Sequence, residues 1–174
     1  MADEPRFHTV VTRVENKPGV LARVAGLFSR RGYNIESLAV APTDDPGFSR
    51  ITFTVDVASS SLDQVVKQLD KLINVVDIEE LDPAHSVERE LMLVSVTAPE
   101  EKRHEILGLI DDFRAYVLDE GPDTMMLSLS ARPSRLDEFE TSLRPYGITE
   151  LQRTGRVALA ALDTAAEAAG RHSG

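Results

Sequence analysis

The stretch that decides the fold is Val14 to Thr43, which reads VENKPGVLARVAGLFSRRGYNIESLAVAPT. It begins at the end of a β-rich segment, and Pro18 and Gly19 interrupt the chain just before apolar residues recur at helical spacing. Gly32 supplies a stop for that helix, and a second β-rich segment follows. The stretch therefore predicts a strand, a turn, a helix and a second strand. The turn also contains Asn16, whose role is either structural or ligand-binding.

Outward from this stretch, the first half of the chain alternates strand and helix patterns. A turn-forming cluster at residues 42–47, PTDDPG, separates the second strand from the third. In the third strand, apolar residues alternate with Thr52 and Thr54, which predicts one face in contact with water. The predicted elements are the strand 7–14, the helix 18–31, the strands 35–41 and 51–57, the helix 62–73 and the strand 75–81.

The second half repeats this order of elements. Its first strand, around 91–96, is apolar on both faces and is therefore expected at the centre of a sheet. A helix from Pro99, strands at 116–119 and 124–130, a helix from Pro133 and a strand at 148–153 follow. The chain is thus predicted to be an α+β protein, a tandem of two ferredoxin-like βαββαβ units. Residues 156–159 are expected to add one further short strand.

The same patterns predict where the domains begin and end. We expect a first domain at 6–82, a linker at 83–87 that contains a proline, and a second domain at 88–158. Residues 159–174 are rich in alanine and finish in GRHSG, so they are expected to form a mobile tail.

Composition excludes several classes of protein. The net charge is −10, from 29 acidic and 19 basic residues, and the basic residues form only isolated pairs. This charge opposes binding to a nucleic-acid backbone. The chain has no Cys, which excludes disulfides and thiolate metal sites. No apolar run approaches the ~20 residues that span a membrane, and the start MADEPRFH lacks a signal-peptide pattern. We expect a cytoplasmic protein that binds neither nucleic acid nor membrane.

A search for catalytic residues finds no convincing group. The four histidines are dispersed and lack metal-ligand spacing, and His104 falls in a charged helical pattern typical of a solvated surface. Acidic pairs such as Asp111-Asp112 are adjacent in sequence, so they do not converge on one point of a helix. Nucleophile-elbow, Walker and dinucleotide-binding glycine motifs are all missing. We therefore predict no catalytic residue, no metal site and no cofactor bound by this chain.

The junction at Asn16 has two interpretations. The first N–H groups of a helix have no partner within the helix, and the helix dipole adds a partial positive charge there. Gly19 has no side chain to block these groups, so the junction could hold a carboxylate. Alternatively, Asn16 caps the helix, Pro18 occupies the first turn and Gly19 merely eases packing. Spacing alone leaves both interpretations open.

A resemblance favours the first interpretation. The motif Asn16-x-Pro18-Gly19-Val20-Leu21 resembles the strand-to-helix signature of ACT domains, which are small amino-acid-sensing modules. The run RVAGLFSRRGYNIESLAVAPTDDPGFSRIT, residues 23–52, more specifically resembles the small regulatory subunits of acetolactate synthase. KQLDKLINVVDI at 67–78 and HSVERELMLV at 85–94 resemble the same family. The resemblance is looser at 112–119 and 153–160.

The resemblance implies a non-catalytic protein. Such a subunit binds the large catalytic subunit of acetolactate synthase, activates it, and confers feedback inhibition by a branched-chain amino acid, usually valine. Thiamine diphosphate, Mg²⁺ and FAD then belong to the catalytic subunit. Two ACT domains pair as a homodimer and hold the amino acid between them. By resemblance, one protomer supplies Asn16, Gly19, Val20 and Leu21, and its partner supplies Asn34 and Ile35.

Two questions stay open at this point. One methylene in an apolar pocket discriminates by only ~1–3 kcal/mol, so the sequence does not choose among valine, isoleucine and leucine. A stand-alone ACT protein that binds an amino acid and controls transcription or transport is the alternative function. The lack of a basic helix argues against direct DNA binding by such a regulator.

Overall fold

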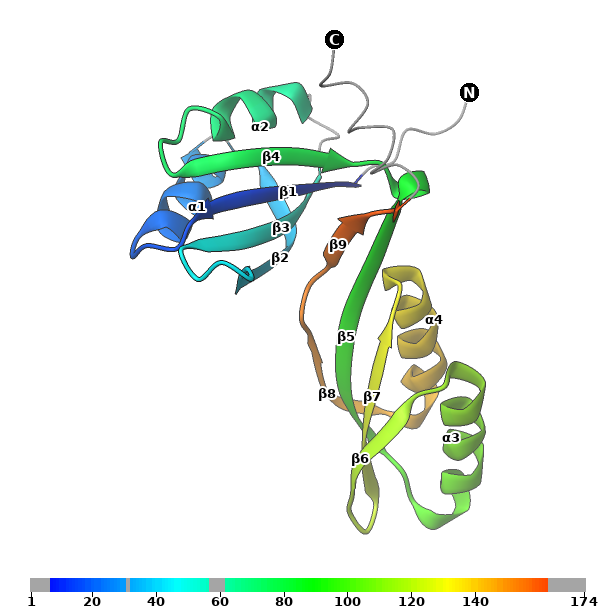
Figure 1. Cartoon of the computed structure of the whole chain (residues 1–174). Helices are drawn as coiled ribbons and strands as arrows, with labels where there is room; N and C mark the ends of the chain where they lie inside the picture. Colours follow the sequence, from blue (N-terminus) through cyan, green and yellow to red (C-terminus); the bar gives the residue numbers. More distant parts are fainter. Residues whose placement is uncertain (1–6, 31, 57–61, 163–174) are drawn as a thin grey trace. The chain divides into compact units, whose positions relative to one another are not determined.

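The computed structural model describes residues 7–30, 32–56 and 62–162. The chain divides into two compact units: Met1–Val87 with Arg156–Gly174, and Glu88–Gly155. The second unit is therefore inserted between two parts of the first, and the chain passes between the units after Val87 and again before Arg156 (Figure 1). Of the predicted tail, residues 163–174 lie outside the described residues.

The first unit is an antiparallel sheet in the order β2-β3-β1-β4 with α1 and α2 against one face (Figure 1). This confirms the predicted βαββαβ order. Its elements are β1 (Phe7–Glu15), α1 (Val20–Arg30), β2 (Asn34–Pro42), β3 (Phe48–Asp56), α2 (Leu62–Leu69), β4 (Val75–Leu81), a 3₁₀ turn (Pro83–His85) and β9 (Val157–Ala160).

The core of this unit lies between the helices and the sheet. Phe28 of α1 and Phe53 of β3 meet edge to face with ring centroids 4.9 Å apart, and both are fully buried. Val10 of β1 and Val65 of α2 complete the contact between the layers. The helical and two-residue periodicities of the sequence therefore correspond to one shared core.

The prediction that Thr52 and Thr54 face water is wrong. Thr52 is 3% exposed and Thr54 is 0% exposed, although both lie on the sheet face opposite the helices. The physical reason is that β9 covers this face, where its Ala158 forms a small buried cluster with Val11 of β1 and Leu81 of β4. Ala158, which is more than a hundred positions from Thr52 and Thr54 in sequence, thus lies on the face that was expected to contact water.

The two helices are shorter than predicted. Helix α1 starts at Val20 because Gly19 has φ +83°, which is outside the helical region. Helix α2 ends at Leu69, after which Leu72 N donates to the carbonyl of Leu69 and the chain turns toward β4. Ile73, which the sequence assigned to the apolar stripe of this helix, is 91% exposed.

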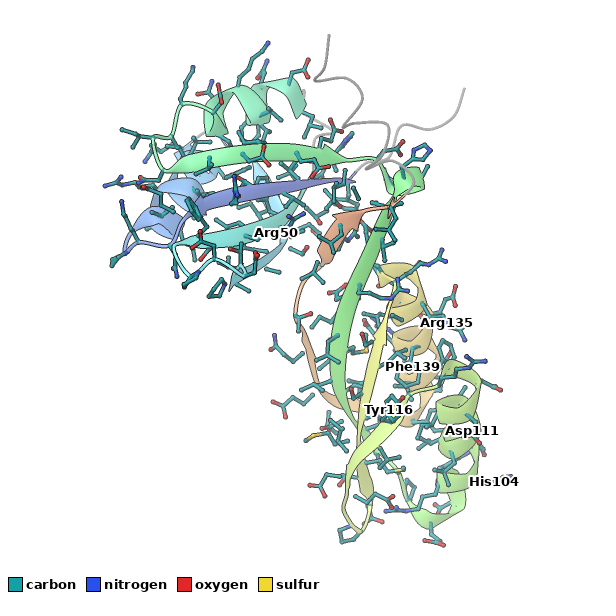
Figure 2. All side chains as sticks on the ribbon, viewed as in Figure 1. Arg50, His104, Asp111, Tyr116, Arg135 and Phe139 are labelled. Atoms are coloured by element: carbon teal, nitrogen blue, oxygen red, sulfur yellow. The ribbon has the colours of Figure 1, made fainter. Side chains whose placement is uncertain are left out.

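The second unit has the sheet order β6-β7-β5-β8, with α3 and α4 against it (Figure 1). Strand β5 lies inside the sheet, as its two apolar faces predicted. Phe139 of α4 is fully buried, and His104 of α3 is exposed as predicted (Figure 2). The elements are β5 (Ser86–Thr97), α3 (Glu100–Phe113), β6 (Tyr116–Glu120), β7 (Thr124–Ala131), α4 (Pro133–Leu143), a 3₁₀ turn (Arg144–Tyr146) and β8 (Ile148–Arg153).

An ion pair ties three elements of this unit together. Arg153 of β8 donates to both carboxylate oxygens of Glu90 on β5, at 3.0 and 2.9 Å, and to Asp137 of α4. Glu90 is only 7% exposed, so this ion pair replaces the contacts with water that its carboxylate loses. The contacts raise the pKa of Arg153 against the opposing effect of burial, and the guanidinium stays charged.

Both units have the βαββαβ order of elements, so the predicted α+β tandem architecture is confirmed.

Candidate functional site at the β1–α1 junction

The junction between β1 and α1 leaves open space above a single glycine. Gly19 has φ +83°, a backbone conformation that favours glycine over every other residue. A Cβ built at this position would meet no atom within 4 Å. Glycine is therefore required here by the backbone and not by crowding, and the position of its missing side chain faces open space.

Asn16 is tied to the turn between β2 and β3. Its backbone N–H donates to the carbonyl of Gly47 at 2.8 Å, and its side-chain Nδ2 donates to the carbonyl of Pro46 at 3.0 Å. A helix cap needs the side-chain oxygen to accept an N–H of the first turn. Among the described residues no such bond reaches Asn16, so the capping interpretation is not supported by the geometry.

A charged network surrounds the junction. Glu15, the last residue of β1, accepts hydrogen bonds from Asn74 Nδ2 and from Lys17 Nζ, the latter at 3.0 Å. Asn74 Oδ1 in turn accepts from Arg23 of α1 at 2.7 Å. The hydrogen bond from Asn74, reinforced by Lys17, lowers the pKa of Glu15. Lys17 thus balances the charge of the Glu15 carboxylate, and Arg23 places a second positive charge beside the junction.

The two residues that follow Gly19 have different exposures. Val20 is 4% exposed and packs in the core, where it anchors the first turn of α1. Leu21 is 42% exposed. Of this pair, only Leu21 presents apolar surface that a ligand or a second chain can cover.

Asn34 and Ile35 lie at the other end of the same sheet. Asn34 is opposite Asp56, which is opposite Phe7 at the start of β1, whereas Asn16 follows the end of β1. Strand β1 has 9 residues, so its ends are roughly 27 Å apart at ~3.4 Å per residue. One chain therefore brings Asn16, Gly19 and Leu21 together but keeps Asn34 and Ile35 away from them.

Strand β2 forms an edge of the sheet, and in the described residues it pairs only with β3. Leu38 and Val40 of this strand are 36% and 42% exposed. They are opposite Phe53 and Ile51, so they lie on the helix side of the sheet, the side that carries Leu21 on α1. This edge is a surface at which a second sheet could pair.

Sequence reasoning did not identify all the residues that shape this junction. The carbonyls of Pro46 and Gly47 hold Asn16, and the turn cluster that contains them was visible in the sequence as a turn but not as a partner of Asn16. Asn74 lies in the connection between α2 and β4, far from Glu15 along the chain, and no local pattern pointed to it.

Two further searches bear on the class of protein. Within residues 7–30, 32–56 and 62–162, no group of three or more His, Cys, Asp or Glu side chains is placed to hold a metal ion. Over the same part of the chain, none of the helices combines the length and the apolar character needed to cross a bilayer.

Comparison with known proteins identifies the family. Residues 11–77 match the family described as "AHAS small subunit-like ACT domain", and residues 89–161 match "Small subunit of acetolactate synthase". A probable acetolactate synthase small subunit of Archaeoglobus fulgidus is 48% identical over 152 residues, 87% of this chain and 95% of that protein. The acetolactate synthase small subunit of Mycolicibacterium smegmatis is 44% identical over 159 residues, covering 91% and 94% of the two chains.

A solved structure agrees with these matches. The crystal structure of the acetolactate synthase small subunit from Thermotoga maritima superposes with a TM-score of 0.82 at 36% identity, covering 89% of this chain and 97% of that one. Both units of the chain thus match one family in sequence and in fold, and the chain belongs to the acetolactate synthase small-subunit family.

Proposed function

We propose that this protein is the regulatory subunit of an acetolactate synthase and senses a branched-chain amino acid, most readily valine, at the β1–α1 junction. It activates the catalytic large subunit and makes that subunit sensitive to feedback inhibition in valine, isoleucine and leucine biosynthesis. The observation that carries the proposal is the open space at Gly19 beside the N–H groups that begin α1.

A free amino acid needs three kinds of partner. Its carboxylate needs N–H donors, which the first turn of α1 after Val20 supplies together with a favourable dipole of about 0.3–2 kcal/mol, whereas Val20 N–H itself donates to the carbonyl of Lys17. Its ammonium needs oxygen acceptors, which asparagine side chains supply. Its side chain needs apolar surface, and exposed Leu21 offers it. Because Lys17 is paired with Glu15, the Arg23 side chain adds the net positive charge near the carboxylate.

The proposed site contains two protomers. Asn34 and Ile35 are too far from Asn16 to share a ligand within one chain, since they lie at opposite ends of β1. If two β2 edges pair in antiparallel fashion about a two-fold axis, the start of one β2 comes beside the end of the other. The end of β2 leads into the turn that holds Asn16. A homodimer through this edge would therefore bring Asn34 and Ile35 of the partner to the junction.

The catalytic partner supplies the chemistry in this proposal. In this proposal the chain binds no Mg²⁺ of its own. Thiamine diphosphate, Mg²⁺ and FAD are assigned to the catalytic subunit, where they would supply the chemistry of the reaction. This chain would act by changing its own dimer packing when the amino acid binds. A coupling free energy of about 1–3 kcal/mol is enough for such a signal.

An activity titration tests the proposal. The catalytic subunit is assayed alone and with this protein, each without and with valine, leucine or isoleucine. We expect the protein to raise the rate, and valine to lower the raised rate more than the other two amino acids. If the protein neither forms a complex with the catalytic subunit nor changes its rate, the proposal is wrong, and a stand-alone amino-acid regulator becomes the better explanation.

A further inference from the structure

A row of three hydroxyl side chains crosses the sheet of the first unit on the face opposite the helices. Thr54 of β3 is in register with Thr9 of β1 on one side and with Ser37 of β2 on the other. Ser37 Oγ donates to Thr54 Oγ1 at 3.2 Å. Thr9 and Thr54 are 1% and 0% exposed. The row therefore joins the edge strand β2 to β3 through one part-buried hydrogen bond, with Thr9 of β1 in register on the other side of Thr54.

Arg156 lies across both ends of this row. Its backbone N–H donates to Ser37 Oγ, and its guanidinium Nη1 donates to Thr9 Oγ1, both at 3.4 Å. Arg156 is also the first residue of the first unit after the chain returns from the second. The preceding residue, Gly155, has φ +81°, so the return point has a backbone conformation that favours glycine.

Ser37 is close to the proposed ligand residues on the same strand. Asn34 and Ile35 begin β2, and the register against β3 shifts between Ile35 and Ser37. A bulge of this kind changes the local twist and direction of a strand. A movement of Asn34 and Ile35 on ligand binding would therefore reach Ser37 through a short, irregular piece of backbone.

The strand that follows Arg156 pairs with β5, and Ala161 N–H donates to the carbonyl of His85 at 2.8 Å, but its contact with β3 is long. Arg50 Nη2 donates to the carbonyl of Ala158 at 3.4 Å, and Figure 2 shows Arg50 on β3. Arg50 Nε is buried and has no hydrogen-bond partner among the described residues. The long hydrogen bond and the unsatisfied donor make the contact between β9 and β3 weak. A weak contact of this kind can change while the pairing of β9 with β5 is kept.

We propose that Ser37 and Arg156 are positioning residues that transmit occupancy of the β1–α1 site from β2 to the point where the chain joins its second unit. The inference rests on the proposed function, since it concerns regulation through the same amino-acid site. Ligand binding alters β2, the Ser37–Arg156 contact changes with it, and β9 shifts on its face of the sheet. The second unit receives the signal through the covalent connection at Gly155.

The test uses the full-length protein, with valine as the probe. Valine affinity is measured by calorimetry, and hydrogen–deuterium exchange is measured in peptides covering residues 156–161. In the wild-type protein, saturating valine is expected to change the exchange rate of this segment at least threefold. Ser37→Ala should bind valine within twofold of the wild-type affinity but lose most of the valine-dependent change in the exchange rate of residues 156–161. Ser37→Thr keeps the hydroxyl and should retain this change in exchange rate.

A matched control removes a hydrogen bond elsewhere in the same sheet. Thr12 Oγ1 donates to the carbonyl of Asp77 at 2.8 Å and joins β1 to β4 without contacting Arg156. Thr12→Ala should leave the response of residues 156–161 intact, even if it lowers stability. With the catalytic subunit added, Ser37→Ala should reduce the inhibition by valine at least threefold, whereas Thr12→Ala should not.

The outcomes separate the two proposals. If wild-type protein does not bind valine, leucine or isoleucine, the proposed function fails and this inference fails with it. If wild-type protein binds valine but the exchange of residues 156–161 is unchanged, or is equally changed in Ser37→Ala, only the inference fails. Loss of valine binding in Ser37→Ala would also overturn it, because Ser37 would then act in the site itself.

Discussion

Gly19 meets two separate requirements, one from the backbone and one from the proposed ligand. Its φ of +83° penalises any side chain by about 1–2 kcal/mol, while the space beside it is open. Gly19→Ala introduces the strain alone, and Gly19→Asp adds a negative charge where a carboxylate must approach. We expect similar losses of thermal stability in the two variants. Valine affinity, measured by calorimetry, should fall at least tenfold in Gly19→Asp and less in Gly19→Ala.

Asn16→Ala should also weaken valine binding at least tenfold. The substitution removes both the amide proposed to contact the ligand and the hydrogen bond to the carbonyl of Pro46. Thr43→Ala serves as the control, because Thr43 Oγ1 stabilises the same turn by donating to the carbonyl of Asp45 at 2.8 Å. Wild-type affinity in both Asn16→Ala and Gly19→Asp would mean that the site lies elsewhere.

Glu15 makes a predictable contribution to stability as pH changes. Its pKa is lower in the folded protein, chiefly because Asn74 and then Lys17 hydrogen-bond to the carboxylate. A depressed pKa contributes stability above the unfolded value of about 4.3, and this contribution is lost as pH falls through the lower folded value. The melting temperature of Glu15→Gln should therefore be below that of wild type at pH 7. The difference should shrink as pH falls below 4, and a constant difference would contradict this assignment.

At the scale of elements, β9 explains why both faces of β3 are buried. Ala158 is 5% exposed and packs against Val11 and Leu81, whereas its neighbour Leu159 is 60% exposed. A positive charge at position 158 would be buried beside the guanidinium of Arg50, which would repel it. We expect Ala158→Lys to lower the free energy of unfolding by about 3 kcal/mol in urea titrations, and Leu159→Lys to change it by less than about 0.5 kcal/mol. Equal effects of the two substitutions would mean that β9 does not cover the sheet in solution.

The elements themselves were largely predictable because their signals are local. Alternating apolar residues, a proline and glycine before α1 and a glycine after it depend on neighbours within one or two turns. The ends of the helices were less predictable. The last turns of the helix expected at 62–73 are replaced by a bend that leads into β4, and Ile73 points to solvent although its spacing fits the apolar stripe. The spacing of apolar residues alone does not reveal where helix α2 stops covering the sheet.

At the scale of the whole molecule, the proposed site requires two chains. Leu38 and Val40 expose apolar side chains on the edge strand β2, so a charge at Leu38 should disrupt edge-to-edge pairing. We expect Leu38→Lys to convert a dimer to a monomer in sedimentation velocity experiments and to lose valine binding at the same time. Ile73→Lys, at a position that is 91% exposed in the same unit, should do neither. A monomeric Leu38→Lys protein that still binds valine would refute the shared site.

By itself, the sequence determined the order of strands and helices, the repeat of that order, and a glycine at the junction before α1, because each depends on residues close together in the chain. Only the tertiary structure decided three other things. It tied Asn16 to the carbonyl of Pro46, it buried Thr52 and Thr54 beneath β9, and it separated Asn34 from Asn16 by the length of β1. Each of these follows from strand register and from the return of the chain at Arg156. Such contacts join residues far apart in sequence, and local periodicity carries no information about them.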